Sequence, residues 1–213
     1  MDPLIRQAIA QHYGLTICEV VPGPRQFVAE THILTTEADD RYFCKITDKP
    51  LFIREIIPGL PLVDYLHRHG IERICHPIAH ATGFYLFVGD RLVVLYSYIA
   101  DADQSYDYDV SGFGRLIATI HALGPPATRS DIQVEDFTFP YADLFDARFE
   151  TPLVKPDGDA ISQQFSAVLK RHERHIRKLK RRLEELVGIC ADKPKRMVIT
   201  HGDGPGNVVM REP

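Results

Sequence analysis

Three residues near the C-terminus have the types and spacing for acid–base and metal chemistry: His201, Asp203 and Asn207. A carboxylate two residues after a histidine is able to act as a general base, and the amide oxygen of an asparagine suits a hard cation such as Mg²⁺. Phosphoryl transfer needs this combination, because a base takes the proton of the acceptor hydroxyl and a metal ion neutralises the phosphates. A metal-binding pair, or a turn that the aspartate closes on its own backbone, is the alternative at this spacing.

A lysine in the middle of a predicted strand is the second candidate. Lys45 lies in residues 41–47, where alternation puts it on the same face as Phe43. A lysine there neutralises a phosphate if a carboxylate holds its ammonium group, and otherwise it is a solvent-facing lysine on an edge strand. Glu55 is the nearest plausible carboxylate, at the start of the next helix, although a glutamate also suits a helix N-terminus.

Five predicted strands and one inserted helix would position Lys45. A short amphipathic helix over residues 3–13 ends at Gly14 and precedes them. A helix is predicted in the second half of residues 50–69 and ends at Gly70, while Pro58 and Pro61 leave the first half undecided. The strands are predicted over residues 18–21, 27–36, 41–47, 84–88 and 92–99.

The second half of the chain is predicted to be helical. Residues 101–109 form an acidic loop, and apolar residues at helical spacing then predict helices over residues 112–123 and 159–187. A short apolar strand over residues 196–200 leads into His201.

The order of these elements predicts an α+β protein with a two-lobed fold. A five-stranded antiparallel lobe in residues 1–99 is followed by an incomplete helical lobe in residues 100–213. The chain has 213 residues, of which 45% are hydrophobic, and this is enough to bury a core in one domain or two small lobes.

Charge and hydropathy argue against two classes of partner. The 29 acidic and 25 basic residues give a net charge of -4, which provides no overall attraction to nucleic acid. The basic run in residues 170–182 carries apolar residues at helical spacing, so we interpret it as the solvated face of an amphipathic helix rather than an RNA site.

No run of about 18 apolar residues and no signal peptide occurs, which predicts a cytoplasmic protein without a membrane partner. The sequence indicates no oligomeric state.

The four cysteines predict no crosslink. Cys18, Cys44, Cys75 and Cys190 are widely spaced and form no CxxC pair. We interpret them as buried, reduced thiols, with a disulfide frame or a zinc site as the alternative.

Taken together, these segments resemble the aminoglycoside phosphotransferase and choline-kinase-like superfamily, and most of all the spectinomycin-type aminoglycoside phosphotransferases. The resemblance covers essentially the whole chain and implies a protein-kinase-like fold. It rests on His12-Tyr13-Gly14, Tyr42-Phe43-Cys44-Lys45-Ile46, Gly70-Ile71-Glu72-Arg73-Ile74, Val94-Leu95-Tyr96-Ser97-Tyr98-Ile99, Gly114-Arg115-Leu116-Ile117-Ala118-Thr119-Ile120-His121, and Thr200-His201-Gly202-Asp203 with Gly206-Asn207.

The resemblance implies a nucleotide site in the first lobe. Lys45 would contact the phosphates of ATP (or GTP), and Glu55 would hold Lys45. Tyr96, Ser97 and Tyr98 would form the hinge at which the base hydrogen-bonds to backbone groups.

The resemblance also implies the catalytic roles. Asp203 would be the catalytic base, His201 would support its loop, and Asn207 would bind Mg²⁺. The implied reaction moves the γ-phosphoryl group to a hydroxyl of a small-molecule substrate, an aminoglycoside or aminocyclitol antibiotic.

Two departures from the family pattern bear on activity. Three residues separate Asp203 from Asn207 where the family usually has four, which shifts the asparagine by up to about 3.5 Å in an extended loop. The chain stops at Pro213, before the segment in which the family carries a second metal-binding aspartate. We therefore expect poor phosphate transfer unless another segment completes the site. The alternatives are a metabolic kinase for choline, homoserine or a sugar, and a truncated, non-catalytic protein that binds a nucleotide or a partner.

Overall fold

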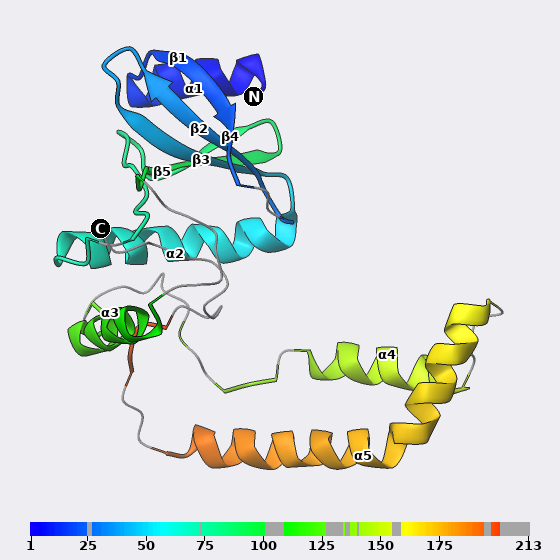
Figure 1. Ribbon diagram of the computed structural model, residues 1–213. Coiled ribbons are helices and arrows are strands. Elements are labelled where there is room, and N and C mark those ends of the chain that lie inside the picture. The colour runs from blue at the N-terminus through cyan, green and yellow to red at the C-terminus, as the bar shows by residue number, and fades with distance from the viewer. Residues whose placement is uncertain are drawn as a thin grey trace. The chain divides into compact units, whose positions relative to one another are not determined.

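The computed structural model describes most of the chain as helices and strands (Figure 1). The described residues are 1–24, 27–72, 74–100, 109–126, 134, 137–139, 141–154, 159–193 and 197–200. Their elements, in chain order, are α1 (Pro3–Tyr13), β1 (Ile17–Pro22), β2 (Glu30–Thr36), β3 (Arg41–Thr47), α2 (Pro50–Arg68), β4 (Leu86–Val88), β5 (Arg91–Ser97), α3 (Val110–Leu123), α4 (Ala142–Val154) and α5 (Ala160–Ala191).

The chain divides into two compact units. The first comprises Met1–Gln133 with Met197–Pro213, and the second comprises Val134–Arg196. The sheet, α1, α2 and α3 thus belong to the first unit, and α4 and α5 to the second. The predicted lobe boundary after residue 99 stays a prediction, since residues 101–108 lie outside the described part of the chain.

The sheet confirms the predicted five-stranded antiparallel arrangement. Its strand order is β1-β2-β3-β5-β4, which places β3 between β2 and β5. Every adjacent pair is antiparallel. The predicted sequence of elements, with one helix inserted after the third strand, is therefore correct.

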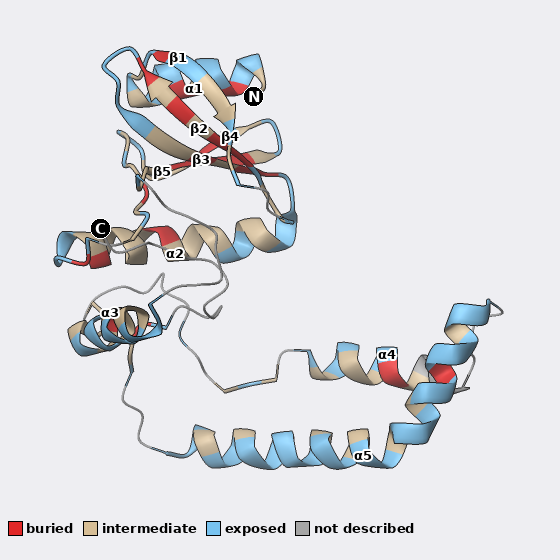
Figure 2. Cartoon of the chain, viewed as in Figure 1, coloured by how far each residue is buried: buried red, intermediate tan, exposed pale blue. Residues whose placement is uncertain are grey.

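Helices α1 and α2 cover the two faces of the sheet. This explains why β5 is a continuous run of apolar residues, since its side chains are buried on both faces. Val93 and Leu95 pack in the cluster that contains Ile5 and Ile9 of α1. Leu92 and Val94 point to the opposite face because successive side chains of a strand alternate, and they pack with α2. Figure 2 shows the buried residues concentrated in the central strands and on one side of α1.

Helix α1 spans the residues predicted for it because both of its ends are encoded locally. The Asp2 side chain caps the first turn by accepting a hydrogen bond from the Leu4 N–H at 2.8 Å, and Pro3 follows at the first helical position. Gly14 ends the helix with a φ of 67°, which glycine adopts without strain. Asp2 also pairs with Arg91 at the start of β5 and so ties the helix to the sheet.

The first half of α2, which Pro58 and Pro61 left undecided in the sequence, is helical. Each proline removes a backbone hydrogen bond and strains an isolated helix by about 3 kcal/mol. Burial of apolar side chains at about 1.5–3 kcal/mol each offsets that cost when the helix lies on a sheet. The side chains that pack there against Leu92 and Val94 are Ile53, Ile56, Ile57 and Leu60.

Gly70 ends α2 in a Schellman arrangement, as predicted. The Ile71 N–H donates to the Leu66 carbonyl at 3.1 Å, and the Gly70 N–H donates to the His67 carbonyl at 3.0 Å. Gly70 has a φ of 87°, and Leu66 and Ile71 are buried together beneath it.

Two glycine substitutions, one within α2 and one directly after it, are expected to change stability in opposite directions. Gly70→Ala puts a Cβ on a left-handed residue and should cost about 1 kcal/mol, whereas Gly59→Ala lies in the helix interior and should add about 0.5–1 kcal/mol. A Cβ at either position meets no atom within 4 Å, so only backbone conformation differs between them. Urea unfolding measures both, and a shift of the two midpoints in the same direction would contradict this account of the helix.

Most of the other elements also differ from their predicted bounds, by one to four residues. Strand β2 begins at Glu30 rather than at residue 27, where the fully exposed Phe27 lies before the strand. Helix α3 begins at Val110 because Asp109 accepts a hydrogen bond from the Ser111 N–H at 2.9 Å. The strand predicted over residues 196–200 is not formed within the described residues 197–200, where Ile199 instead packs against Leu66, Ile71 and Ile120.

The second unit contains one helix that the sequence did not predict. Phe145 and Phe149 of α4 stack with ring centroids 5.6 Å apart, and Arg177 of α5 lies over the Phe149 ring. Arg177 pairs with Glu150 at 2.7 Å, and Lys180 pairs with Asp146 at 2.7 Å. Helix α4 therefore contacts α5 through one ring–cation contact and two ion pairs.

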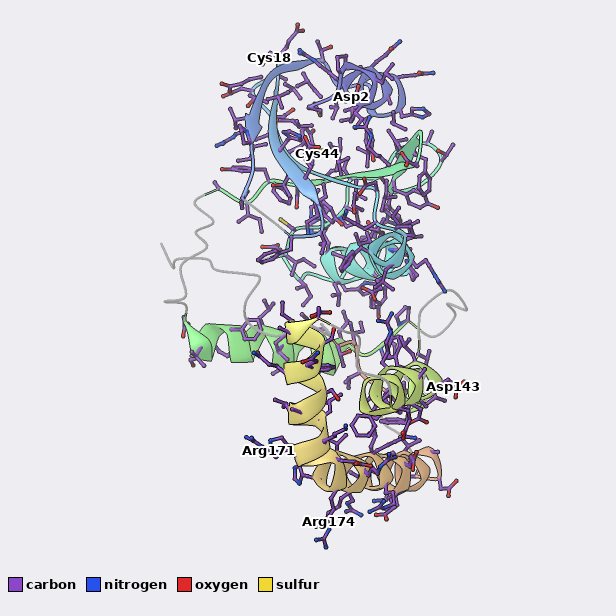
Figure 3. All side chains as sticks on the ribbon, turned by 90° about the vertical axis from the view of Figure 1, so that its right-hand side faces the viewer. Asp2, Cys18, Cys44, Asp143, Arg171 and Arg174 are labelled. Atoms are coloured by element: carbon purple, nitrogen blue, oxygen red, sulfur yellow. The ribbon has the colours of Figure 1, made fainter. Side chains whose placement is uncertain are left out.

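The basic run of α5 is divided between solvent and these ion pairs. Arg171 and Arg174 extend away from the helix into solvent (Figure 3). No helix in the part of the chain that the structure describes has the length and apolar character needed to cross a membrane.

Candidate functional site

Lys45 lies in the middle of β3, between two strands, on the side of the sheet that α2 covers. It pairs with Thr31 of β2 and with Val94 of β5. Its neighbour Cys44 packs in the opposite cluster with α1, so alternation turns Lys45 toward α2. The Nζ atom lies 6.0 Å from the centroid of the Tyr96 ring, at the outer limit of a cation–π contact.

Lys45 carries its charge in an unfavourable setting. Burial lowers the pKa of its ammonium group, and the neighbouring Cys75 raises it to a lesser degree. Within the described residues, no carboxylate lies at ion-pair distance from its Nζ atom. An anion that binds beside such a partly desolvated cation therefore stabilises it, because the cation has no counter-ion of its own.

The ion pair predicted between Lys45 and Glu55 is not formed in the described structure. Glu55 is exposed, and it follows Ile53, which packs on the sheet, by two residues. Two residues correspond to about 200° around a helix, so Glu55 points away from the sheet. The nearly buried carboxylate of α2 is instead Asp64, and Arg68 holds it at 2.9 Å.

The end of β5 is bonded to the chain segment that precedes β4. The Ser97 N–H donates to the His76 carbonyl at 2.8 Å, and the Ser97 hydroxyl accepts from the His76 N–H at 3.1 Å. Further along, the Ile78 N–H donates to the Leu95 carbonyl at 2.8 Å. The Ser97 N–H is therefore already used by the protein itself and is not available to a ligand.

Tyr96 and Tyr98, the other two predicted hinge residues, have defined neighbours. Tyr96 pairs with Phe43 of β3, and its side chain packs with Val94 and α2. The Arg41 guanidinium lies 4.0 Å above the Tyr98 ring and holds it at the beginning of β3. The structure thus brings Lys45 and this end of β5 into one region of the first unit.

Cys75 belongs to the same region, although its apolar sequence context predicted a buried thiol. The residue is exposed, and its Sγ donates to the Ser97 carbonyl at 3.3 Å. Protein atoms still surround the sulfur closely enough that burial raises the pKa of the thiol, while Lys45 lowers it. Nothing in the sequence near Cys75 indicates this position, because it depends on pairing with β5.

A stacked pair of histidines lies behind this segment. The His67 and His76 rings are parallel within 4°, with centroids 3.5 Å apart. Burial and the adjacent His67 lower the pKa of His76, and Asp64 raises it. Its position beside His67 thus favours the neutral form of the His76 ring.

Comparison with solved structures identifies the fold. One match is an aminoglycoside phosphotransferase from Alicyclobacillus acidocaldarius subsp. acidocaldarius DSM 446, with 18% sequence identity over 91% of this chain and 55% of that chain and a TM-score of 0.51. Another is the amicoumacin kinase hAmiN in complex with AMP-PNP, Ca²⁺ and Ami, with 17% identity over 83% of this chain and 52% of that chain and a TM-score of 0.50. The chain has the kinase-like fold of the aminoglycoside phosphotransferases.

The kinase-like fold confirms the predicted fold class. Comparison of the sequence with known families and proteins does not assign the chain to a particular family. No protein-family model and no curated protein matches the sequence. The chain spans about half the length of the solved structures that it matches. The closer resemblance to spectinomycin-type enzymes stays a prediction.

The catalytic residues predicted for this kinase-like fold lie outside the described part of the chain. His201, Asp203 and Asn207 all follow Thr200, the last described residue. Ile199, two residues before His201, is buried against α2 and α3. Packing of Ile199 thus holds the chain against the first unit two residues before the predicted catalytic segment begins.

A cavity of about 310 Å³ in the first unit is not the predicted nucleotide site of the kinase-like fold. Its charged residues already have partners in the chain: Glu30 pairs with His32, Arg91 with Asp2, and Lys49 with Asp48. Neither Lys45 nor Tyr96 lines it. The residues that do are Phe27, Val28, Ala29, Glu30, Ile46, Thr47, Asp48, Lys49 and Arg91.

Proposed function

We propose that this chain binds a nucleoside triphosphate at Lys45 and transfers its γ-phosphoryl group to a hydroxyl of a small molecule, with aminoglycosides or aminocyclitols as the substrate class. One observation carries the proposal: Lys45 is half-buried in the central strand of a kinase-like fold, its pKa is lowered by burial, and no described carboxylate pairs with it. Phosphate oxygens beside Nζ would supply the missing negative charge through charge-assisted hydrogen bonds.

ATP (or GTP) and Mg²⁺ are the proposed nucleotide and metal. A kinase of similar fold was solved with AMP-PNP and Ca²⁺, which supports a nucleotide used together with a divalent cation. Among the described residues, no group of three His, Cys, Asp or Glu side chains is placed to hold a metal ion. The proposed ligand is Asn207, which the family resemblance assigns, and the metal would neutralise phosphate charge.

Asp203 is the proposed base in the transfer step. The hydroxyl oxygen of the substrate forms a bond to the γ-phosphorus while the bond to the β–γ bridging oxygen breaks, and the nucleoside diphosphate leaves. The hydroxyl proton passes to the Asp203 carboxylate, and His201 supports the loop that holds it. These roles rest on the family resemblance of Thr200-His201-Gly202-Asp203.

One observation favours a second candidate, a protein that binds nucleotide without transferring phosphate. Protein kinases need the ion pair between the strand lysine and a helix glutamate to be in place for activity. Here Glu55 is exposed on the outer side of α2 and has no ion pair with Lys45. A chain fixed in that arrangement would hold phosphates without orienting them for transfer.

Binding and turnover measured on the same protein distinguish the two candidates. With Mg²⁺ and AMP-PNP at 100 times Kd, mass action should add about 2.7 kcal/mol to stability, which raises Tm by about 5–10 °C in a chain of this size. ATP consumption is then followed with spectinomycin, streptomycin, choline and homoserine. Turnover with either antibiotic supports transfer, turnover with choline or homoserine alone indicates a metabolic kinase, and a Tm shift without turnover supports the second candidate. No Tm shift contradicts both.

A further inference from the structure

Cys75 is fixed in place beside the end of β5. Its Sγ donates to the Ser97 carbonyl at 3.3 Å. The next residue, His76, accepts from the Ser97 N–H and donates to its hydroxyl, and Ile78 bonds to Leu95. Four hydrogen bonds over four residues leave the thiol little freedom to move relative to the strand.

The same end of β5 also borders Lys45. The Tyr96 ring, one residue before Ser97, lies under the Lys45 ammonium group at 6.0 Å. Pro77, two residues after Cys75, pairs with Tyr96 across the strand edge. Lys45 and Cys75 also affect each other electrostatically, since the lysine lowers the pKa of the thiol and the thiol raises that of the lysine.

We propose that Cys75 lines the nucleotide site beside Lys45, so that bound nucleotide shields its thiol and a covalent adduct on the thiol blocks nucleotide binding. The inference rests on the proposed function, and it adds a modifiable residue that lies outside the segments on which the family resemblance rests. Phosphates drawn to the Lys45 ammonium group occupy the space next to the sulfur. An adduct on the sulfur fills that space in turn.

N-Ethylmaleimide is the probe. The Cys75 thiolate sulfur adds to the maleimide double bond, a carbon–sulfur bond forms, and the proton released by the thiol ends on the neighbouring ring carbon, so no leaving group is needed. Mass spectrometry of proteolytic peptides then gives the labelling rate of each cysteine. The reaction is run with and without Mg²⁺ and AMP-PNP.

Two other cysteines serve as internal controls, and both are labelled in Figure 3. Cys18 matches Cys75 closely, because it is exposed and its Sγ donates to a strand carbonyl, that of Thr35, at 3.3 Å. It lies on β1, two strands away from β3. Cys44 is fully buried, and burial raises the pKa of its thiol to about 12, so its labelling reports unfolding.

Nucleotide at ten times Kd should slow the labelling of Cys75 about tenfold, because the reagent reaches only the unoccupied fraction. Cys18 should be labelled at the same rate in both conditions, and Cys44 should stay unlabelled. Protein labelled at Cys75 should lose the nucleotide-induced Tm shift. The Cys18→Ser variant should lose it equally after labelling, whereas labelling should not alter the shift that Cys75→Ser shows.

Failure of this inference and failure of the proposed function give different results. If unlabelled protein binds AMP-PNP while Cys75 is labelled equally fast with and without it, the inference is wrong and the nucleotide site stands. If unlabelled protein shows no Tm shift with AMP-PNP at any concentration tested, the proposed function is wrong and the inference fails with it.

Discussion

Replacing Lys45 with methionine should weaken nucleotide binding about tenfold to hundredfold, since a hydrogen bond to a charged group contributes about 1.5–3 kcal/mol. At the nucleotide concentration that stabilises wild type by about 2.7 kcal/mol, the stabilisation of the variant should fall to half or less. Calorimetric titration with Mg²⁺ and AMP-PNP measures the affinity directly. Methionine keeps an unbranched apolar stem in place of the lysine stem, so most of the volume of the side chain is retained.

The fold itself should tolerate this substitution. Burial lowers the pKa of Lys45, which means that the folded chain disfavours the charged form relative to the unfolded chain. At neutral pH the charge therefore works against folding, and a neutral side chain removes that cost. The urea midpoint of Lys45→Met without nucleotide should equal or exceed that of wild type.

Lys49→Met is the matched control. Lys49 lies four residues further on, its side chain is 58% exposed, and it forms a long ion pair of 3.7 Å with Asp48. Its side chain makes no capping hydrogen bond to α2. Nucleotide affinity should be unchanged in this variant. Equal affinities for wild type and Lys45→Met would show that Lys45 is not the phosphate contact.

Replacing Ile5 with alanine should destabilise the first unit by about 2–5 kcal/mol, a large share of the roughly 5–15 kcal/mol that holds a domain folded. The Ile5 side chain is 0% exposed and lies in the cluster of α1 with Leu34, Val93 and Leu95. Alanine would leave a cavity between α1 and the sheet, where close-packed strands cannot relax to fill it. Urea unfolding followed by circular dichroism measures the loss.

The adjacent residue provides the control for helix propensity. Leu4 is 62% exposed on the same helix, and alanine is an equally good helix former, so Leu4→Ala should change stability by less than about 0.5 kcal/mol. A difference between the two variants of under about 1 kcal/mol would mean that α1 does not pack on the sheet as described.

The sequence predicted α1 and β3 with their observed bounds because both are determined locally. Asp2, Pro3 and Gly14 encode the two ends of α1 through a side-chain cap, a fixed φ and a left-handed residue. Strand alternation alone put Lys45 and Phe43 on one face of β3 and opposed them to Cys44, which is buried on the other. The sequence also predicted an antiparallel sheet of five strands, whereas the order of those strands, with β3 beside β5, was seen only in the structure.

Contacts between residues far apart in the chain decided those features of the fold and of the site that the sequence did not predict. The first half of α2 is helical despite its two prolines because burial against β5 outweighs their local cost, and the same packing turns Glu55 away from Lys45. Helix α4 depends on charges of α5 that lie about thirty residues later. Cys75 lies beside the end of β5 only because its segment pairs with that strand. The sequence by itself thus determined which residue types and local elements the site has. The tertiary structure decided which of them meet, because the free energy of that pairing comes from surfaces that the unfolded chain does not bring together.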